Sequence, residues 1–575
     1  MKETICKRVA QVRATLIGRE HGVETLIVPT MDPHNSEYVA GHWQTRQWLT
    51  GFTGSAGTAV LTADEALLWT DSRYWLQAEM QLEGTPFRLM REGEDQDIAA
   101  WLAEHATGSI GFPADMMVPS LFAELFPGKL GTRATALRAN SFDALWTDRP
   151  PLPLSQVERM PDALAGETAG SKLQRITGWL RERGLLSLFM SDLSEICWTL
   201  NLRADDIPYN PFFVGFLMLN TGGRHRLYAH AEQFSAPLRD YLETLGIDMR
   251  PYAEGLRMQR SRLRKKEGES PVPAFRARKN ATEQEGFRQA HLRDGVVLVR
   301  FLREMDEEDG REWTELNVDE RLTALRAEQP GFRGLSFGTI AACGPHGAVV
   351  HYEATPESSV SLPRRGFLLI DSGAHYDCGT TDITRTVALG PLTEEERRVY
   401  TLVLRGHLQL QHMRFPENTT GLQLDTAARM AMWREGYDYG HGTGHGVGHR
   451  LGVHEGPVQI RKNTRACTLL YIRAGQVITD EPGIYVAGRF GVRIENMLLC
   501  REAGTTDFGR WLDFEPLTLC PYDRCAIMPE MLSREERQWL NAYHAHVCAT
   551  LLPHLSDEAD RQWLRQATAE IDVPT

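Results

Sequence analysis

Four acidic residues and one histidine stand out between residues 371 and 495, because each lies inside a glycine-rich or apolar segment. Asp371 ends an apolar run that reads as a strand, and Asp382 follows it closely. A carboxylate in an apolar strand is costly to bury unless a cation compensates its charge. The other three stand in Gly-Thr-Gly-His-Gly-Val-Gly, Asp-Glu-Pro-Gly and Arg-Ile-Glu-Asn, at His445, Glu481 and Glu495.

The five side chains together predict a metal site. Any one of them alone is better explained as a surface acid or a buried core histidine. Four carboxylates that share one site would repel one another strongly unless cations neutralise them. Hard oxygen ligands with one imidazole suit a pair of divalent first-row cations better than zinc in a thiolate cage. We therefore expect a dinuclear site in the C-terminal half of the chain.

Length and composition restrict the rest of the protein. A chain of 575 residues is too long for one core, and its 42% hydrophobic and 24% charged residues are typical of a globular protein. The net charge of −13 argues against a nucleic-acid partner or an anionic membrane. No apolar run reaches the roughly 18–20 residues of a membrane helix, and the N-terminus lacks the apolar core of a signal peptide. We expect a cytoplasmic protein without a membrane partner.

The first two segments look like copies of one plan. A helical pattern, the tetrapeptide Arg-Glu-X-Gly and an apolar strand follow one another over residues 9–28 and again over residues 176–190. Neither copy has a compact set of His, Asp and Glu, so we interpret both as scaffold. Proline-rich stretches at 149–153 and 267–273 are expected to interrupt regular structure and to mark the domain joints.

The third segment begins near Arg278 and is framed by two predicted helices. The first covers residues 283–305. The second is a closing helix near the C-terminus, where Ser533 and Glu536 have the spacing of a capping box. All five candidate metal ligands lie between these helices.

The ordered motifs resemble those of the pita-bread dinuclear metallopeptidases, and among them most closely the aminopeptidase P family of the three-domain cytosolic type. The likeness extends beyond the metal site. It includes matching segments in both N-terminal parts and near the C-terminus, at residues 51–58, 69–74, 201–211 and 514–518.

The resemblance implies an α/β (α+β) architecture. It consists of two creatinase-like N-terminal α/β domains, at residues 1–150 and 151–277, followed by a pita-bread catalytic domain at residues 278–575. The second domain is shorter between Gly246 and Pro271 than the resemblance leads us to expect.

The resemblance also assigns roles to the five ligands. Asp371 would bind one metal in a bidentate manner, Asp382 and Glu495 would bridge both metals, and His445 and Glu481 would complete the other. Two Mn²⁺ ions per subunit are expected, with Co²⁺ or Zn²⁺ as alternatives. A hydroxide bridging the two metals would attack the scissile carbonyl, with Glu481 as general base.

Further residues match positions around the metals in this family. His351, His441 and His454 are expected to contact the substrate or the tetrahedral intermediate, because an imidazole can donate to a developing oxyanion. Arg493 is expected to orient the carboxylates as an outer hydrogen-bond donor. His449 has no such counterpart, and we expect it at the periphery.

The sequence departs from the family pattern between the first two ligands. His375 and Cys378 stand where the family commonly has Gln and Asp. Neither replaces a ligand. Our hypothesis is that they make the site more sensitive to soft ions or to oxidation.

The function implied by the resemblance is that of an Xaa-Pro aminopeptidase, which removes the N-terminal residue from peptides with proline in the second position. Two alternatives remain: a prolidase, which cleaves Xaa-Pro dipeptides, and a metal-free pita-bread module that binds peptides without hydrolysis. The family often forms homodimers through the catalytic domain, and we expect exposed apolar residues near Trp511, Leu512 and Phe514 to contribute.

Overall fold

The computed structural model divides into two compact units. It describes residues 2–18, 22–138, 141–265, 268–307, 312–462 and 470–572. The N-terminal unit comprises Met1–Pro161 and Glu167–Val272, and the catalytic unit comprises Asp162–Gly166 and Pro273–Thr575. The first predicted Arg-Glu-X-Gly tetrapeptide falls mostly on residues 19–21, which lie outside the described residues.

The first sheet of the N-terminal unit has six strands in the order β4-β3-β2-β1-β5-β6. These strands are β1 (Thr25–Pro29), β2 (Thr58–Leu61), β3 (Ala66–Thr70), β4 (Arg88–Arg91), β5 (Ile110–Pro113) and β6 (Ala134–Leu137). Apolar side chains of β1, β2, β3 and β5 form one core with those of α4 and α5. The helices around this sheet are α1 (Lys2–Leu16), α2 (Thr45–Thr50), α3 (Trp75–Leu82), α4 (Ile98–His105), α5 (Pro119–Leu125) and α6 (Leu130–Arg133).

The second sheet repeats the first four strands of this plan. Its order is β12-β11-β10-β8, and each neighbouring pair has the direction of its counterpart in β4-β3-β2-β1. This agreement supports the predicted duplication. The elements are β8 (Ser187–Met190), β10 (Gly215–Asn220), β11 (His225–Ala229), β12 (Ile247–Pro251), α8 (Ala169–Glu182), α9 (Leu193–Leu200), α10 (Ala236–Thr244) and α11 (Tyr252–Arg262), with a short pair of β7 (Glu158–Arg159) and β9 (Leu202–Arg203).

The second proline-rich stretch was predicted to interrupt regular structure, and this prediction is wrong in part. A helix, α12 (Val272–Ala277), begins inside it. Pro273 lies in the first turn of that helix, where a missing N–H breaks no intrahelical hydrogen bond.

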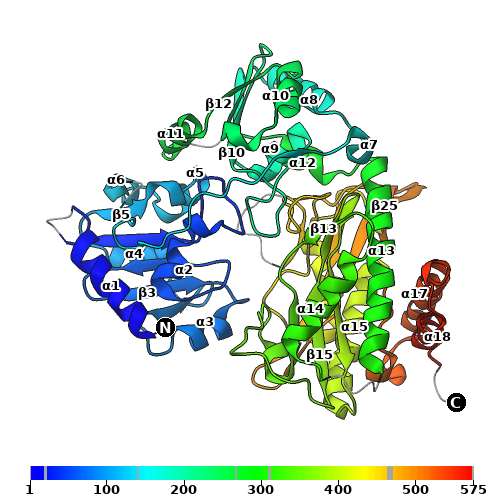
Figure 1. Cartoon of the computed structure of the whole chain (residues 1–575). Helices are drawn as coiled ribbons and strands as arrows, with labels where there is room; N and C mark the ends of the chain where they lie inside the picture. Colours follow the sequence, from blue (N-terminus) through cyan, green and yellow to red (C-terminus); the bar gives the residue numbers. More distant parts are fainter. Residues whose placement is uncertain are drawn as a thin grey trace. The chain divides into compact units, whose positions relative to one another are not determined.

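Both helices predicted to frame the catalytic segment are present. Helix α13 (Ala281–Asp306) and helix α17 (Arg534–Leu551) each begin with a capping box, and that of α17 is formed by Ser533 and Glu536 as predicted. Helix α13 runs beside α14 (Figure 1). It also contacts α17, and α15 packs against α16. The remaining helices of the unit are α7 (Asp162–Ala165), α14 (Glu315–Ala327), α15 (Glu394–Gln411), α16 (Gly421–Trp433) and α18 (Glu558–Ala567).

The strands of the catalytic unit form several small sheets rather than one large one. The two that carry most of the site have the orders β14-β15-β18 and β19-β26-β25-β22. The strands are β13 (Phe332–Leu335), β14 (Ile340–Cys343), β15 (Phe367–Ser372), β16 (Ala374–Tyr376), β17 (Gly379–Thr380), β18 (Ile383–Ala388), β19 (Phe415–Pro416), β20 (Gly444–His445), β21 (Gln459–Ile460), β22 (Val477–Asp480), β23 (Gly483–Val486), β24 (Phe490–Arg493), β25 (Asn496–Thr506) and β26 (Gly509–Pro516).

The apolar residues expected to lie exposed on β26 are mostly buried. Leu512 and Phe514 belong to a core cluster with residues of α16 and β25, so the expectation was wrong for both. The exposed apolar side chain nearest in sequence is Phe508, at the turn between β25 and β26, which is 90% exposed.

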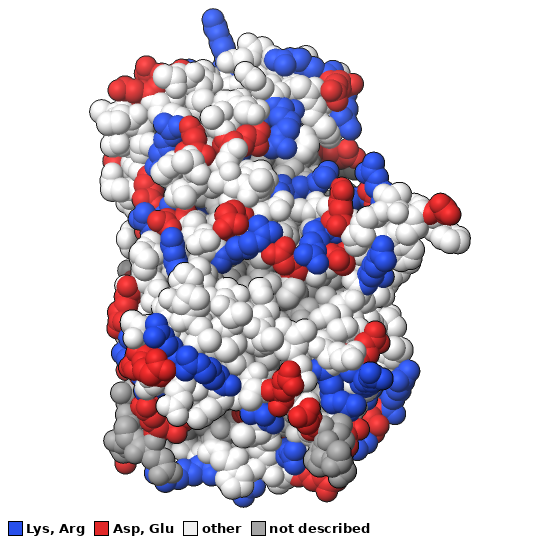
Figure 2. All heavy atoms as spheres, turned by 90° about the vertical axis from the view of Figure 1, so that its right-hand side faces the viewer, with Lys and Arg blue, Asp and Glu red and all other residues white. Residues whose placement is uncertain are grey.

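None of the described helices is long and apolar enough to cross a bilayer. On the face drawn in Figure 2, the described acidic and basic side chains are interspersed, so this face has no continuous basic surface.

A buried ion pair joins the first two helices of the catalytic unit. Arg326 of α14 donates to both carboxylate oxygens of Asp294 on α13, at 2.8 and 3.0 Å, and Tyr376 donates to the same group at 2.9 Å. Burial alone would raise the pKa of Asp294, but Arg326 and Tyr376 outweigh it and hold this pKa below its ordinary value. The stability gained from the pair is therefore present at neutral pH and is lost as the pH falls through the lowered pKa.

Replacing Asp294 with asparagine is expected to destabilise the catalytic unit by about 3–5 kcal/mol, because Arg326 would keep a buried charge without its partner. Denaturant unfolding followed by tryptophan fluorescence measures this loss. The matched control is Glu328→Gln, since Arg300 and Glu328 join the same two helices at the surface. It should cost no more than about 1 kcal/mol. Equal losses in the two variants would contradict the prediction.

Candidate metal centre

Asp371 and Asp382 lie on neighbouring strands of the sheet β14-β15-β18. Asp371 is near the end of β15, opposite Ile340 of β14 and Thr384 of β18. Asp382 immediately precedes β18. Apolar side chains of β15 fill the core, so both carboxylates come to one end of the sheet with little exposure to water.

The other three candidates come from separate segments that hydrogen bonds bring together. His445 ends β20, Glu481 directly follows β22 and Glu495 directly precedes β25. The backbone N–H of Glu481 donates to the carbonyl of Thr443 at 2.8 Å, and that of Glu495 donates to the carbonyl of Thr384 at 3.0 Å. These bonds tie the two glutamates to the segments that carry His445 and Asp382.

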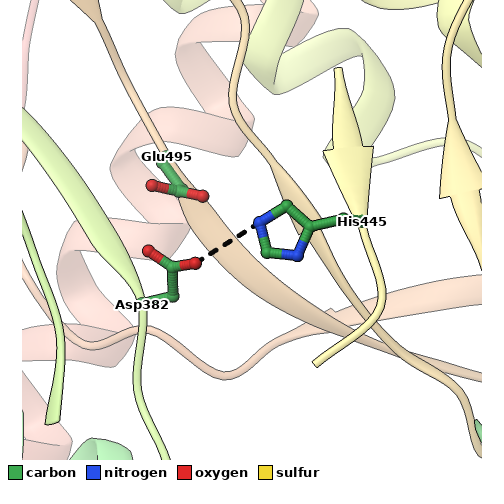
Figure 3. Close-up of side chains that lie close together, drawn as sticks. All are labelled: Asp382, His445 and Glu495. Atoms are coloured by element: carbon green, nitrogen blue, oxygen red, sulfur yellow. Dashed lines mark ion pairs between the residues drawn. The ribbon is translucent and has the colours of Figure 1, made fainter. Parts of the chain in front are cut away.

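Three of the five candidate side chains converge on one point. One ligand atom each from Asp382, His445 and Glu495 lies within 4.8 Å of the others, and the three groups point toward one another (Figure 3). His445 Nε2 is 3.5 Å from Asp382 Oδ2 and 3.7 Å from Glu481 Oε1. Asp371 acts electrostatically on Glu481 and Glu495, which places it in the same cluster.

The cluster holds more negative charge than its surroundings compensate. Burial, followed by repulsion from Asp382 and Asp371, raises the pKa of Glu495 well above its ordinary value. Burial likewise raises the pKa of Glu481 to about 7. Burial alone would lower the pKa of His445, but Asp382 and Glu481 raise it to about 9. Without a cation, the group would therefore retain protons that it would lose in water.

Two observations show that a divalent cation fits these residues. Asp371 Oδ1 is buried and accepts no hydrogen bond from the described part of the chain, while Oδ2 accepts one from Arg493 at 2.6 Å. His445 Nδ1 lies 2.9 Å from the carbonyl of Gly446 and donates to it, so Nε2 is the nitrogen that faces the carboxylates and that would bind a cation once its proton is lost. Oxygen donors with one imidazole are ligands that divalent first-row cations accept.

Arg493 contacts three parts of the site. This fully buried guanidinium donates to Asp371, to Tyr485 Oη at 2.8 Å and, through Nε, to Thr384 Oγ1 at 3.2 Å. Thr384 Oγ1 in turn donates to Glu495 Oε2 at 2.8 Å. These contacts agree with the predicted outer-donor role, which remains a prediction.

His441 already uses both ring nitrogens within the protein. Nδ1 lies 2.7 Å from the carbonyl of Gly442, and Nε2 lies 2.8 Å from Tyr485 Oη. Because Nδ1 donates to the carbonyl of Gly442, Nε2 of the neutral ring accepts from the hydroxyl of Tyr485, which itself accepts from Arg493. Tyr485 was missed by the sequence analysis. The one sequence feature that could have pointed to Tyr485 is its position on β23, four residues after Glu481.

The two other predicted substrate histidines stand in segments that contact the cluster or Arg493. His454 is exposed, and its ring centroid is 4.4 Å from that of His445. His351 is half-buried and follows Val350, whose carbonyl accepts a hydrogen bond from Arg493 at 3.3 Å. Their contacts with a substrate remain predictions.

The unusual residues between the first two ligands are held in the interior. His375 Nδ1 lies 3.0 Å from Thr380 Oγ1. Burial raises the pKa of the Cys378 thiol, so it stays protonated and the hypothesis of sensitivity to soft ions loses support. His449, expected at the periphery of the metal site, is buried, and its Nε2 lies 2.7 Å from the carbonyl of Cys378.

Comparison with known families and proteins agrees with this geometry. Residues 285–502 match the model of metallopeptidase family M24, and residues 510–571 match the C-terminal region of that peptidase. Residues 8–140 and 148–267 each match a creatinase/prolidase N-terminal domain.

Full-length relatives give the same result. The chain is 33% identical to aminopeptidase P1 of Lotus japonicus over 98% of this chain and 99% of that protein. It is 35% identical to a probable Xaa-Pro aminopeptidase P of Laccaria bicolor, over 97% of this chain and 92% of that protein. A crystal structure of X-prolyl aminopeptidase from Caenorhabditis elegans, described as a cytosolic enzyme with a di-nuclear active site, superposes with a TM-score of 0.92 at 32% identity, covering 99% of this chain and all of that one.

The fold and the carboxylate-imidazole cluster define a metal-dependent peptidase. The chain belongs to metallopeptidase family M24, in the group of the aminopeptidases P. The predicted fold class, with two creatinase-like N-terminal domains before a pita-bread catalytic domain, is confirmed. The boundaries at residues 150 and 277 remain predictions.

Proposed function

We propose that this enzyme hydrolyses the bond between the first residue of a peptide and a proline in the second position. The observation that carries the proposal is the convergence of Asp382, His445 and Glu495 within 4.8 Å, with Asp371 and Glu481 beside them, in a chain that matches Xaa-Pro aminopeptidases over nearly its whole length.

Five residues would hold two divalent cations, and we propose Mn²⁺, with Co²⁺ or Zn²⁺ as alternatives. Asp371 would bind one cation, Asp382 and Glu495 would be shared by both, and His445 and Glu481 would complete the second. Bound cations would polarise the scissile carbonyl and lower the pKa of a water molecule.

The protein's own groups would move the proton and orient the ligands. Glu481 would accept the proton of the attacking water. Its Oε1 lies beside His445, and the hydrogen bond that it accepts from Thr479 is long, at 3.5 Å, so the carboxylate keeps a lone pair for this proton. Arg493 would keep Asp371 oriented and would balance part of its charge. His351 and His454 would donate to the substrate. His441 would contact the substrate next to Tyr485, or would act by holding the Tyr485 hydroxyl in place.

Two alternative functions are less well supported. A prolidase would cleave only dipeptides, and the full-length likeness to aminopeptidases P argues against it. A metal-free peptide-binding module would leave four clustered carboxylates with only Arg493 and His445 to compensate their charge, which is costly. By analogy with the described C. elegans enzyme we also propose a cytoplasmic location, and by family resemblance a homodimer.

Peptides of the form Xaa-Pro-Pro are expected to be cleaved after the first residue by metal-stripped protein that is supplied again with Mn²⁺. Matched Xaa-Ala-Pro peptides should be cleaved at least about 100-fold more slowly, since a site fitted to a particular group discriminates strongly against an analogue without it. Chromatography of the products measures both rates, and parallel assays with Co²⁺ and Zn²⁺ identify the preferred ion.

An Xaa-Pro dipeptide assayed beside the longer peptide separates the alternatives. Cleavage of the dipeptide alone would favour a prolidase. If no peptide were cleaved with any of the three ions by well-folded protein, the enzymatic proposal would fail and the binding module would gain support.

A further inference from the structure

A fully buried carboxylate lies at the base of the segment that carries His351. Glu315 is the first residue of α14 and has no exposed surface. Its Oε1 accepts the backbone N–H of Cys343 at 2.9 Å, and its Oε2 accepts that of Val360 at 3.2 Å. One side chain thus binds both ends of residues 343–360, which we name the His351 loop.

Two side chains inside the loop donate to the same carboxylate. Tyr352 Oη donates to Oε2 at 2.9 Å, and His346 Nδ1 lies 2.9 Å from Oε1. The rings of His346 and Tyr352 stack, with centroids 4.3 Å apart. Tyr352 is the residue next to His351, so a bond to Glu315 fixes the backbone directly beside that histidine.

No lysine or arginine in the described part of the chain forms an ion pair with Glu315. Its compensation comes from the donors of the His351 loop and from the N-terminal end of α14, where the helix dipole favours a negative charge. Hydrogen bonds to a charged group are stronger than neutral ones, and a buried carboxylate that loses them is costly. The carboxylate therefore requires the loop to stay in this conformation.

The opposite side of the loop rests on the metal centre. The carbonyl of Val350 accepts from Arg493 Nη2 at 3.3 Å, and the same nitrogen donates to Asp371 at 2.6 Å. Gly347 packs so closely on Gly491 of β24 that a Cβ on Gly491 would lie 1.7 Å from the carbonyl oxygen of Gly347. Val350 and Tyr352, on either side of His351, are thus fixed to the metal centre and to Glu315.

We propose that Glu315 is a positioning residue that holds His351 at the substrate through the His351 loop. The inference rests on the proposed function, in which His351 contacts the substrate. Glu315 has no exposed surface, and its hydrogen-bond partners among the described residues all belong to the His351 loop and not to the five candidate ligands. It acts by restricting the loop, so that the imidazole needs no reorganisation when a peptide binds.

Glu315→Gln tests the proposal with little change of shape. Both carboxylate oxygens of Glu315 accept hydrogen bonds from the loop, and the amide nitrogen of glutamine cannot replace either oxygen as an acceptor. The loop would therefore lose the hydrogen bonds to one of the two oxygens. We expect kcat/KM for an Xaa-Pro-Pro peptide to fall about 10- to 100-fold, the size of effect that small misplacements of a reacting group produce. The matched control is Glu320→Gln on the exposed face of the same helix, which should stay within about twofold of the parent.

A double-mutant cycle with His351→Ala separates positioning from general destabilisation. If Glu315 acts through His351, Glu315→Gln should have almost no further effect on kcat/KM once the imidazole is gone. Losses that multiply in the double variant would overturn the proposal. Should Glu315→Gln fail to fold, Tyr352→Phe enters the same cycle, since it removes one donor and keeps the ring that stacks on His346.

Amide hydrogen exchange gives a readout that does not depend on activity. The N–H groups of Cys343 and Val360 should exchange slowly in the parent and at least about tenfold faster in Glu315→Gln. Unchanged exchange would overturn the proposal even if activity fell. If the parent cleaved no proline peptide but exchange rose in the variant, the proposed function would fail while the anchoring of the loop by Glu315 would stand.

Discussion

Replacing Glu481 with glutamine is expected to lower kcat on Xaa-Pro peptides by about 10³-fold or more, because a positioned general base contributes about 10²–10⁴-fold and an amide cannot accept the proton. Glutamine has the same shape and can still accept a hydrogen bond from Thr479 Oγ1, which lies 3.5 Å from Glu481 Oε1. Steady-state kinetics at saturating Mn²⁺, with the metal content of each preparation, measure the effect. The circular dichroism spectrum should not change.

The control must separate proton transfer from metal binding, since Glu481 is also a candidate ligand. Excess Mn²⁺ should refill the variant without restoring kcat if the carboxylate acts as the base. Glu481→Asp keeps a carboxylate of shorter reach and should recover part of the rate. Full recovery of Glu481→Gln by added metal would mean that Glu481 serves as a ligand and that another group takes the proton.

The elements that the sequence predicted best are those with local signals. The capping box of Ser533 and Glu536 begins α17, because an N-cap side chain and the N3 carboxylate satisfy each other's backbone donors whatever the tertiary context. The apolar run before Asp371 forms β15, since a fully buried strand needs apolar side chains on both faces. Such signals depend on neighbours a few residues away.

The wrong expectation that Leu512 and Phe514 are exposed overlooked the alternation of side chains along a strand. Side chains alternate between the two faces of a strand, so Leu512 and Phe514 share one face and pack into the core together. Trp511 lies on the other face and is only partly buried. The period of two would have predicted this arrangement.

Most of the candidate site was found through the order of its motifs, but the contacts that orient it could not be found that way. Tyr485 bonds to both Arg493 and His441, yet in the sequence it resembles any tyrosine of a strand. Glu315 looks like an ordinary acid in the first turn of a helix. Its partners extend as far as Val360 along the chain, and only the folded structure brings them to one carboxylate.

Replacing Glu495 with glutamine is expected to change stability in opposite directions with and without metal. In the metal-free protein, burial and then repulsion from Asp382 and Asp371 raise the pKa of Glu495. A carboxyl group whose pKa is raised by folding destabilises the folded state as the pH rises above its unfolded value of about 4.3. The metal-free variant should therefore unfold at a higher temperature than the metal-free parent, and by more at pH 8 than at pH 5.

With Mn²⁺ the order should reverse. An ion at about 1,000 times its Kd stabilises the state that it binds by about 4 kcal/mol, and the variant forfeits much of this gain. Glutamine can still accept the hydrogen bond from Thr384 Oγ1, so the local packing is kept. The matched control is Glu502→Gln, an exposed position on β25, which should follow the parent under both conditions.

Equilibrium dialysis then tests whether Glu495 is shared by two ions. We expect the parent to bind two Mn²⁺ per chain and Glu495→Gln to weaken both, whereas His445→Gln should weaken one. A variant at Glu495 that kept one ion at the affinity of the parent would show that this carboxylate serves a single ion. Because one ligand atom each from Glu495, Asp382 and His445 lies within 4.8 Å of the others, loss of the shared carboxylate should weaken the binding of every ion in the cluster.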